Sequence, residues 1–468
     1  ILGRLRCLGW TNRKRVRRRE QIIQISKIEG GPMKELYNKH KYSILKRTLR
    51  TLQSPSFGGM LLVLCVILAM LLANSPYKEY YFNFIEMPIT ISVGSYVNTH
   101  SLLDVVNDGL MVFFFFLVGL EIKRELLVGH LREVRMALFP VVSAMGGVIM
   151  PAVLYSVFPH SAATAGGWAI PTATDIAFSL AVLSLISSSV PIGLKVFLTT
   201  LAIADDIIGI VIIGVLYTSQ LSMVAAFAAI GLLVFMYLLN KAGVRSTFVY
   251  AVLSVLVWIA VAKSGIHPTI AGVLAAMTIP VKPKVAFEEY LKRSRVHFKK
   301  LITHETATVN TLIDDNAKES IFTIGRLSER ALTPLTKMET GLHSFVHYLV
   351  LPFFAFVNAG IAFSAETEVF SPVSMGVFVG LFIGKPLGIY FMARLTAFLK
   401  IASPPSGVTW MHIFGAGIIA GIGFTIAIFM TTLVFAGTSA ADSAKIGIAA
   451  GSLISAVVGL LVLKRAKP

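Results

Sequence analysis

Four charged residues stand inside long apolar runs of this sequence. Asp175, the neighbours Asp205 and Asp206, and Lys385 each lie near the middle of a stretch of otherwise uncharged residues. A charge at the depth of a bilayer core is costly, so such residues are rare and mostly bind or move ions. A structural ion pair is the alternative explanation for any one of them. Four charges at a similar depth favour one common site.

The two neighbouring aspartates cannot serve as an equivalent pair on one helical face. Successive residues of an α-helix differ by about 100° in direction. One of Asp205 and Asp206 can therefore face a cation, while the other meets a cationic side chain from another helix, for which Lys385 is the deep candidate. Carboxylates with threonine hydroxyls and backbone carbonyls form a hard, oxygen-rich site. A proton and a metal cation can compete for such oxygens.

Helix-breaking residues occur at the same depth as these charges. They are Gly166, Gly167 and Pro171 ahead of Asp175 in PTATDIAF, and Gly415, Gly417, Gly421 and Gly423 in FGAGIIAGIGFTIAIF. Glycine-interrupted segments in two halves of a chain point to discontinuous helices and an ion site near the midplane. Asp175 would then balance the positive helix N-termini and Lys385 the negative C-termini. Close helix packing is the alternative role for some of these glycines.

The elements that position these residues are predicted to be membrane helices. Hydrophobic residues make up 55% of the 468 residues and charged residues only 14%, whereas soluble domains carry about 25% charged residues. The apolar blocks approach or exceed the roughly 20 residues that cross a bilayer core as a helix, and their runs are continuous rather than alternating. We therefore expect an all-α polytopic membrane protein.

About twelve transmembrane helices are predicted, with an inverted repeat formed by spans three to five and ten to twelve. Spans 4 and 11 would be the two crossed discontinuous helices. The twelve lie near residues 57–74, 106–126, 135–157, 163–185, 190–217, 222–240, 247–263, 266–280, 340–363, 372–396, 410–433 and 443–463. An even number puts both termini on one side, and Lys and Arg gather in the alternate loops on that side. Both termini are expected to be cytoplasmic.

The net charge of +18 is concentrated in the first 56 residues, which hold fifteen Lys and Arg against three Glu. This stretch shows no nucleic-acid-binding module, so we expect a basic cytoplasmic tail near anionic lipid and no nucleic-acid partner. Residues 29–32 can be encoded with a ribosome-binding AGGAGG ahead of Met33. We therefore expect translation to start at Met33, with residues 1–32 not translated. Cys7 and Cys65 form no metal motif and no disulfide is expected between them.

Two segments interrupt the membrane domain, which is expected over residues 57–464. The mixed-charge stretch 282–337 is predicted to be a cytoplasmic loop insertion, in which Phe287–Leu301 has the pattern of an amphipathic helix. The stretch Ile89–Thr99 alternates like a short hairpin strand and is expected to contact a partner subunit.

The sequence resembles the NhaA family of sodium/proton antiporters from about Ser54 to Lys464. The resemblance is carried by NDGLMVFFFFLVGLEIKREL, ATDIAFSLAVL, LTTLAIADDIIGIVIIGVLYT, GIHPTIAGV, LPFFAFVNAGIAF, GKPLGI and GIGFTIAIF. It implies a secondary active transporter rather than an enzyme, with no cofactor and no catalytic residue. The implied activity is electrogenic, pH-regulated extrusion of Na⁺, and also Li⁺, in exchange for external H⁺. The implied setting is a homodimer in the lipid of the bacterial inner membrane.

The resemblance also assigns roles to particular residues. Cation binding and proton exchange fall on Asp205 and Asp206, with Asp206 as the main ligand for Na⁺. The supporting intramembrane residues are Thr174, Asp175 and Lys385, the pH-sensing residues are Glu121, Arg124, Glu125, Glu339 and His343, and two further positions linked to activity and pH response are Asp108 and His267. The chain departs from the family pattern at Thr340, where the best-known member of the family carries a second histidine, and in the greater length of the 282–337 loop.

Two other functions share parts of this pattern. An intramembrane aspartyl protease also uses two buried carboxylates, but on different helices and sharing a proton. Here the two aspartates are neighbours, and no GxGD motif is present. A sodium-coupled symporter of an organic solute could use the same crossed-helix architecture with a wider cavity.

Overall fold

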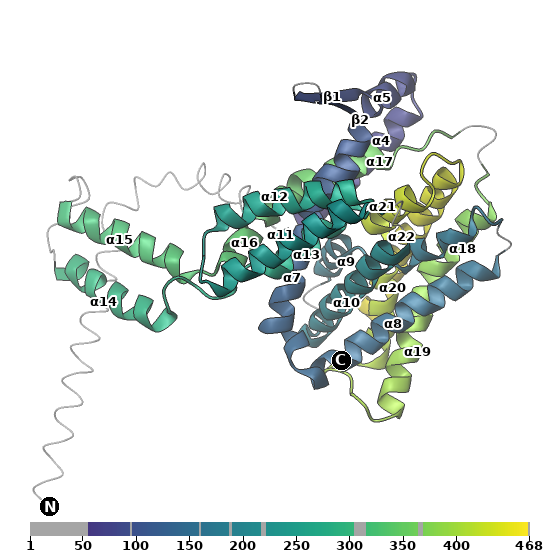
Figure 1. Ribbon diagram of the computed structural model, residues 1–468. Helices are drawn as coiled ribbons and strands as arrows, with labels where there is room; N and C mark the ends of the chain where they lie inside the picture. The colour runs from purple at the N-terminus through teal and green to yellow at the C-terminus, as the bar shows by residue number, and fades with distance from the viewer. Residues whose placement is uncertain are drawn as a thin grey trace, which may run out of the picture. The chain divides into compact units, whose positions relative to one another are not determined.

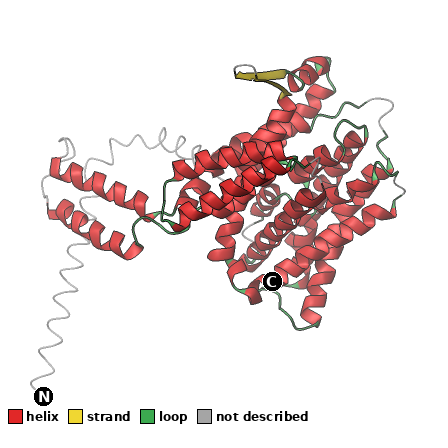
Figure 2. Ribbon diagram, viewed as in Figure 1, coloured by secondary structure: helices red, strands yellow, loops and turns green. Residues whose placement is uncertain are grey.

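The computed structural model describes residues 55–93, 96–158, 161–186, 190–216, 221–303, 315–363 and 368–466 (Figure 1). Within these ranges the chain is helical apart from one two-stranded sheet (Figure 2). The expected start at Met33 and all but the last two residues of the predicted basic tail, residues 1–56, lie outside the described part of the chain.

Nine helices of the described chain are long and apolar enough to cross a membrane, or up to eleven when two bent pairs each count as one span. Several are assembled from consecutive pieces. The nine comprise α6 (Leu102–Asp104) with η1 (Val105–Leu110) and α7 (Met111–Leu127); α8 (Val134–Val157); η3 (Ala165–Thr172) with α9 (Ile176–Ser184); α10 (Ile192–Leu216); α11 (Met223–Lys241); α12 (Thr247–Ser264); α16 (Pro334–Phe345) with η4 (Val346–Val350) and α17 (Leu351–Asn358); α18 (Pro372–Val379) with η5 (Gly380–Gly384) and α19 (Lys385–Phe398); and α22 (Ala440–Arg465). The expected all-α membrane fold is therefore confirmed at this coarse level.

The two bent pairs and one short helix account for the remaining apolar segments. The pairs are α4 (Pro55–Ala73) with α5 (Lys78–Ile85), and α20 (Trp410–Ala420) with α21 (Phe424–Val434). Helix α13 (Pro268–Thr278) is apolar but has only 11 residues. A short 3₁₀ turn, η2 (His130–Arg132), joins α7 to α8.

The predicted hairpin is present as strands β1 (Pro88–Val93) and β2 (Tyr96–Ser101), which pair antiparallel (Figure 2). The register places Pro88 opposite Ser101 and Thr90 opposite Thr99. The two threonine hydroxyls of the latter pair lie 3.0 Å apart, a cross-strand hydrogen bond that fixes the register on that face.

Two helical segments are interrupted where the sequence carries its glycine and proline breakers. Residues 165–172 form a 3₁₀ helix containing Pro171, and an extended stretch follows before α9. Helices α20 and α21 are bent by 45° across Gly421–Gly423. A Cβ on Gly421 would lie 2.4 Å from the carbonyl oxygen of Leu381. Only glycine lets the backbones approach this closely.

The two interrupted segments are joined by hydrogen bonds to backbone carbonyl oxygens. The amide of Asp175 donates to the carbonyl oxygen of Ile422 at 2.7 Å, and the hydroxyl of Ser179 donates to the carbonyl oxygen of Ile419 at 3.1 Å. Backbone groups freed by a broken helix must find partners inside a membrane protein. Here each interruption supplies acceptors or donors for the other.

Helix α19, which carries Lys385 at its start, packs along α8. A Cβ on Gly388 would lie 2.0 Å from the carbonyl oxygen of Gly146, so this crossing also requires glycine. The π-helical turn η5 directly precedes Lys385. The other two π-helical turns of the described chain are η1, which contains Asp108, and η4, which follows the helix of His343. Such turns occur frequently at functional sites.

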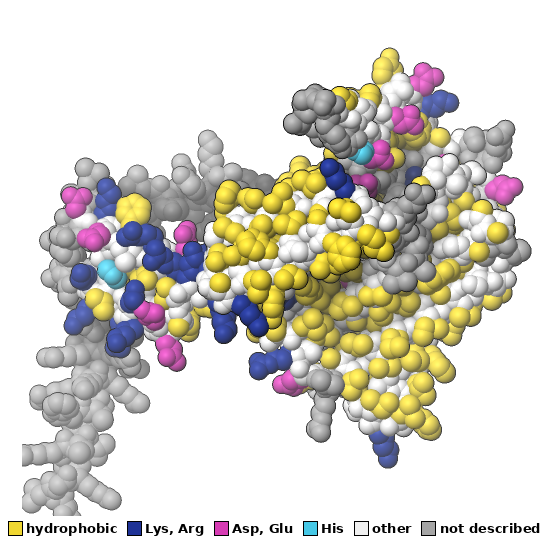
Figure 3. Space-filling view, viewed as in Figure 1, with side chains coloured by type: hydrophobic (Ala, Val, Ile, Leu, Met, Phe, Trp, Pro, Cys, Tyr) yellow, Lys and Arg dark blue, Asp and Glu magenta, His cyan; other side chains and the backbone are white. Residues whose placement is uncertain are grey.

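The main buried core lies among the helices that carry the charged residues. It includes side chains of α7, α8, α10 and α17 to α22, and a second buried cluster joins α7 to α11, α12, α13 and α16. Outward-facing side chains of α11 and α12, among them Val224, Phe227 and Phe248, are apolar and exposed. Figure 3 shows hydrophobic side chains covering much of the helical surface on the face in view. A surface of this kind fits a lipid environment.

The 282–337 insertion contains two helices, α14 (Phe287–Thr303) and α15 (Asp315–Ala331). They run antiparallel, with the hydroxyls of Tyr290 and Ser328 3.2 Å apart. At their base, the amides of Lys284 and Val285 donate to the carbonyl oxygen of Arg330 at 3.0 and 3.1 Å. The predicted amphipathic helix is thus found as α14, whereas α15 was not predicted.

Candidate functional site

The centre of the site is an ion pair between α10 and α19. Lys385 is completely buried, and its Nζ pairs with Oδ2 of Asp205, which is also buried. Nζ also donates to the hydroxyl of Thr174 at 2.6 Å. That hydroxyl lies 2.6 Å from Oδ2 of Asp205 and 3.0 Å from the carbonyl oxygen of Ala420, so it can donate to either. Lysine, threonine and aspartate from three segments therefore meet beside the break in α20–α21.

Asp206 is buried beside this pair but makes no hydrogen bond to any described residue. The charged groups close enough to act on it electrostatically include the carboxylates of Asp205, Glu121 and Asp175. Oδ1 of Asp205 is also buried and without a hydrogen-bond partner in the described part of the chain. Buried polar atoms are nearly always paired. Acceptor oxygens that the protein itself leaves unpaired are suited to a cation or a proton.

Asp175 caps two helices at once. Its Oδ1 accepts the amide of Phe178 in the first turn of α9 at 2.9 Å. Its Oδ2 accepts the amide of Thr425 at 3.0 Å and the Thr425 hydroxyl at 2.5 Å, both in the first turn of α21. A carboxylate is stabilised by the partial positive charge of a helix N-terminus. The charge of Asp175 is thereby balanced by backbone dipoles and remains separate from the Asp205–Lys385 pair.

The balance of formal charge at the centre follows from these contacts. Asp205 and Asp206 bring two negative charges, and Lys385 brings one positive charge. One negative charge is left over in a buried place. Leaving a charge unpaired in a medium of low polarity is unfavourable. With both aspartates ionised, one further positive charge would balance the group.

The residues assigned by resemblance to pH sensing are brought together between the C-terminal half of α7 and α16. Arg124 pairs with Glu339 and lies 3.2 Å from Glu125. Glu121, on the same face of α7, is close enough to interact electrostatically with Arg124 and Glu339. The fifth predicted residue, His343, follows Glu339 by one turn of α16 and stacks on His347 with ring centroids 4.1 Å apart.

Asp108 and His267 also meet, although 159 positions apart in the chain. Oδ1 of Asp108 lies 3.5 Å from Nε2 of His267. The other ring nitrogen of His267 lies 2.7 Å from the hydroxyl of Thr269, and Trp258 donates to the carbonyl oxygen of Asp108 at 3.1 Å. The two residues join the π-helical turn η1 to the start of α13. They lie outside the hydrogen-bond network of Asp205 and Lys385.

Thr425 is a site residue that the sequence reasoning missed. Its amide and hydroxyl hold Asp175 across the two interrupted helices. A signal was present, because Thr425 follows the glycine break of GIGFTI as closely as Thr174 and Asp175 follow the break in PTATD. His347 was missed as well. Its spacing of four from His343 places both imidazoles on one helical face.

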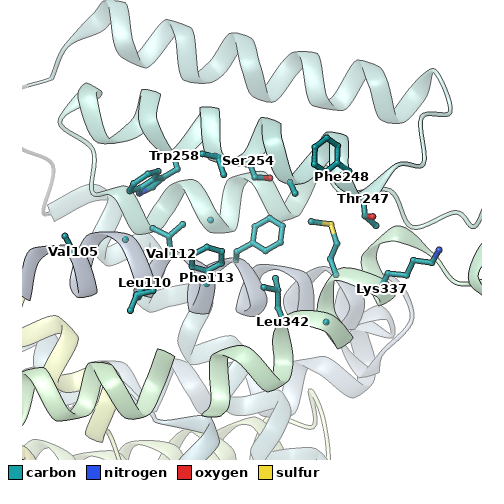
Figure 4. A pocket seen from close by; sticks show the side chains of 17 residues that line it. Val105, Leu110, Val112, Phe113, Thr247, Phe248, Ser254, Trp258, Lys337 and Leu342 are labelled. Carbon is teal, nitrogen blue, oxygen red and sulfur yellow. The ribbon is translucent and has the colours of Figure 1, made fainter. Parts of the chain in front are cut away.

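A separate cavity has none of the residues of the charged site in its lining. A cavity of about 800 Å³ lies between the α7, α12, α13 and α16 segments and is lined mainly by apolar side chains such as Phe113, Phe248 and Trp258. Figure 4 shows Trp258, Ser254 and Phe248 of α12 on one side and Leu110, Val112, Phe113 and Leu342 on the other. No carboxylate lines it. Apolar cavities of this kind suit hydrocarbon groups rather than small cations.

Within the described ranges, no group of three or more His, Cys, Asp or Glu side chains is arranged to hold a metal ion.

These features define a polytopic helical membrane protein with a charged site buried where two interrupted helices meet. The chain belongs to the Na⁺/H⁺ antiporter 1 family, whose model matches residues 49–463. The resemblance seen in the sequence is thus confirmed.

The chain is similar to Na⁺/H⁺ antiporters NhaA from several bacteria. It is 42% identical to the protein of Wolinella succinogenes over 412 residues, covering 88% of this chain and 91% of the relative. It is 38% identical to the protein of Bacteroides thetaiotaomicron, covering 90% and 98%, and 41% identical to that of Citrobacter koseri, covering 89% and 97%. Among solved structures, the sodium proton antiporter MjNhaP1 from Methanocaldococcus jannaschii shares 13% identity at a TM-score of 0.49, covering 90% of this chain and 95% of its own. That likeness is too weak to inform function.

Proposed function

We propose that this chain, a Na⁺/H⁺ antiporter by family, binds the transported ion at Asp206 and Asp205. The observation that carries the proposal is the presence of two buried carboxylates beside one buried ammonium group. The leftover negative charge is neutralised either by a proton or by a sodium ion. Because both occupy the same oxygens, binding of one excludes the other, and that exclusion is what couples an antiporter.

Lys385 couples ion entry to proton release in this account. In the proton-loaded state it pairs with Asp205, and a sodium ion near Asp206 adds positive charge next to it. Oδ2 of Asp205 is then drawn toward the sodium ion, and Lys385 is displaced and releases its proton, in addition to the proton that leaves the Asp206 carboxyl group. Thr174 contacts both groups and can exchange its hydrogen bond between Asp205 and the carbonyl oxygen of Ala420. Release of more than one proton for each sodium ion would make the exchange electrogenic.

The remaining features of the proposal concern architecture and setting. The membrane domain would have twelve spans, with α13 as a short one and with the η3–α9 and α20–α21 segments as crossed discontinuous helices of an inverted repeat. Both termini would face the cytoplasm, and the β1–β2 hairpin would join two copies in the bacterial inner membrane. Na⁺ and Li⁺ would be extruded in exchange for external protons, with Glu121, Arg124, Glu125, Glu339 and His343 setting the response to pH. Asp108 and His267 would contribute to that response.

Everted membrane vesicles from bacteria that lack their own sodium/proton antiporters test this function. Respiration acidifies the vesicle interior, and added Na⁺ should then alkalinise it when the wild-type chain is present, as followed with acridine orange. Asp206→Asn keeps the shape of the side chain but removes its charge and its proton, so the response should be lost. The matched control is Asp442→Asn, which removes an aspartate of α22 that lies outside the site and pairs with Lys445.

The same vesicles separate the alternative functions. A symporter would give no alkalinisation with Na⁺ alone and would take up Na⁺ only with an organic solute, whereas a protease would respond to neither. Asp206→Asn vesicles that exchange Na⁺ at near wild-type rate would show that the site is assigned to the wrong residue.

A further inference from the structure

One face of the α14–α15 pair is apolar and exposed. On α14, Phe287, Leu291, Phe298 and Ile302 follow one another at spacings of four, seven and four residues. At about 100° per residue these four side chains fall within about 60° of one another. They form a stripe along the length of the helix. Phe287 is 66% exposed and Ile302 79% exposed, and Leu291 and Phe298 are exposed as well.

Helix α15 extends the same face. Ser294 on α14 and Ser320 and Leu327 on α15 are buried, so they mark the sides on which the two helices touch. For an antiparallel pair in contact on those sides, the helical spacing puts Ile321 on the same side as the α14 stripe. Ile321 is exposed too. Phe322 is 62% exposed but points about 100° further round, toward the outer edge of the pair.

Basic side chains flank this apolar face. Helix α14 carries five Lys and Arg against two Glu. Arg293 is paired with Glu289, whereas Lys292 and Arg295 are exposed along one edge of the stripe. Figure 3 shows Lys and Arg side chains gathered over this pair of helices, with hydrophobic side chains between them.

We propose that the apolar face of the α14–α15 pair, formed by Phe287, Leu291, Phe298, Ile302 and Ile321, lies on the surface of an anionic lipid bilayer. A helix with an apolar stripe and a basic edge binds in the plane of such a surface, with its apolar side chains between the head groups. Anionic head groups complement Lys292 and Arg295. A second copy of α14 or the basic stretch 1–56 would bring like charges together.

The attachment of the α14–α15 pair to the membrane domain also favours a lipid bilayer as the partner of its apolar face. The amide of Leu335, in the first turn of α16, donates to the carbonyl oxygen of Pro280, just after α13. Both ends of the pair are therefore fixed next to the apolar helices α13 and α16. The topology proposed above decides only which leaflet is touched, the cytoplasmic one.

Fluorescence quenching in the full-length protein tests the proposal. In a background with Cys7→Ser and Cys65→Ala, single cysteines made by Ile302→Cys or Phe322→Cys carry the environment-sensitive dye NBD. The labelled protein is reconstituted into phosphatidylcholine bilayers with or without phosphatidylglycerol. Quenching by doxyl-labelled lipid and by aqueous iodide is measured for each. The Phe322 position is the matched control, because it lies on the same pair with similar exposure.

With phosphatidylglycerol present, the dye at position 302 should be quenched several-fold more by doxyl lipid, and less by iodide, than the dye at position 322. Equal access of iodide to both positions would overturn the proposal. Protection at position 302 that rises with the protein-to-lipid ratio and ignores lipid charge would instead indicate a second copy. Protection that disappears when residues 1–32 are deleted would indicate the chain's own tail.

A second pair of variants tests the basic edge. Lys292→Gln with Arg295→Gln should remove the dependence on phosphatidylglycerol. Arg326→Gln with Arg330→Gln removes the same charge from the opposite side of the pair, judged by helical spacing, and should leave that dependence intact. If both double variants lose the dependence on phosphatidylglycerol equally, the proposed orientation of the pair on the bilayer is wrong. Sodium/proton exchange measured in the same bilayers should persist in the two labelled cysteine variants and in the two double variants, since none of the substituted residues touches the ion site.

Discussion

At the scale of single residues, the pairing of Lys385 with Asp205 compensates two buried charges of the site. Both groups are buried and in contact. Removing one partner of a buried pair leaves the other uncompensated and in soluble proteins costs about 3–5 kcal/mol. Removing both avoids part of that cost, because no unpaired charge remains.

We therefore predict sub-additive losses of stability in a double-mutant cycle with Asp205→Asn and Lys385→Gln. The coupling should be about 1–3 kcal/mol, as expected for contacting residues, when read from thermal unfolding in detergent. The control cycle is Asp442→Asn with Lys445→Gln, a pair 3.6 Å apart whose aspartate is half exposed. Its coupling should stay below about 1 kcal/mol. Strict additivity in the Asp205–Lys385 cycle would mean that the two residues do not depend on each other.

Thr425 supports a second prediction at this scale. Thr425→Val keeps the shape of the side chain but removes the hydroxyl that donates to Asp175 at 2.5 Å. A hydrogen bond to a charged group contributes about 1.5–3 kcal/mol, so we expect a clear loss of thermal stability and slower sodium/proton exchange. Thr431→Val on the same helix is the control, because that buried hydroxyl donates only to the carbonyl oxygen of Ala427 in its own helix. Equal effects of the two variants would argue against a special role for Thr425.

At the scale of elements, the charged cluster formed by Glu121, Arg124, Glu125, Glu339 and His343 connects α7 to α16. Arg124 on α7 binds Glu339 on α16, and α7 also carries Glu121, which acts electrostatically on Asp206. A change in the charge of the cluster can thus reach the ion site through a single helix. The ion pair itself is half exposed at Arg124, so its contribution to stability should be small.

We predict that Glu339→Gln and Glu125→Gln shift the pH profile of transport more than the maximal rate. Each removes a carboxylate that faces Arg124, while the ion site keeps its own contacts. Glu289→Gln is the control, since it removes one carboxylate from the exposed Glu289–Arg293 pair of α14. Sodium-dependent alkalinisation measured across a range of pH gives the profile. If the pH profile of transport is unchanged in both Glu339→Gln and Glu125→Gln, these residues do not set the response to pH.

At the scale of the whole molecule, the sequence predicts the helical membrane fold well, and the charges inside its apolar runs, Asp175, Asp205, Asp206 and Lys385, are buried. Continuous apolar runs leave few alternatives to helices, and a lone charge inside such a run is conspicuous. The contact of Asp175 with helix N-termini also followed from its place beside a break. The limits of the spans were less certain, because polar capping sets them. Helix α16 begins at Pro334 after its cap Thr333, six residues before the start of the predicted span at 340.

Contacts between distant segments could not be predicted from residue patterns alone. The bond from Thr425 to Asp175 joins residues 250 positions apart. The resemblance named Asp108 and His267 separately, and their contact was not predicted. Helix α15 was missed because its mixed charges hide the apolar face that packs on α14. Such features depend on how helices are placed against each other, which local spacing does not encode.

Competition between sodium and protons for one set of buried oxygens is the central claim, and proton release on sodium binding measures it directly. Purified protein in weakly buffered detergent solution with a pH-sensitive dye receives NaCl, or choline chloride as a control. The wild-type chain should release protons as Na⁺ binds, and its apparent affinity for Na⁺ should rise with pH. Asp206→Asn should abolish the release, whereas Asp442→Asn should not. Sodium binding without proton release, at an affinity independent of pH, would contradict the account.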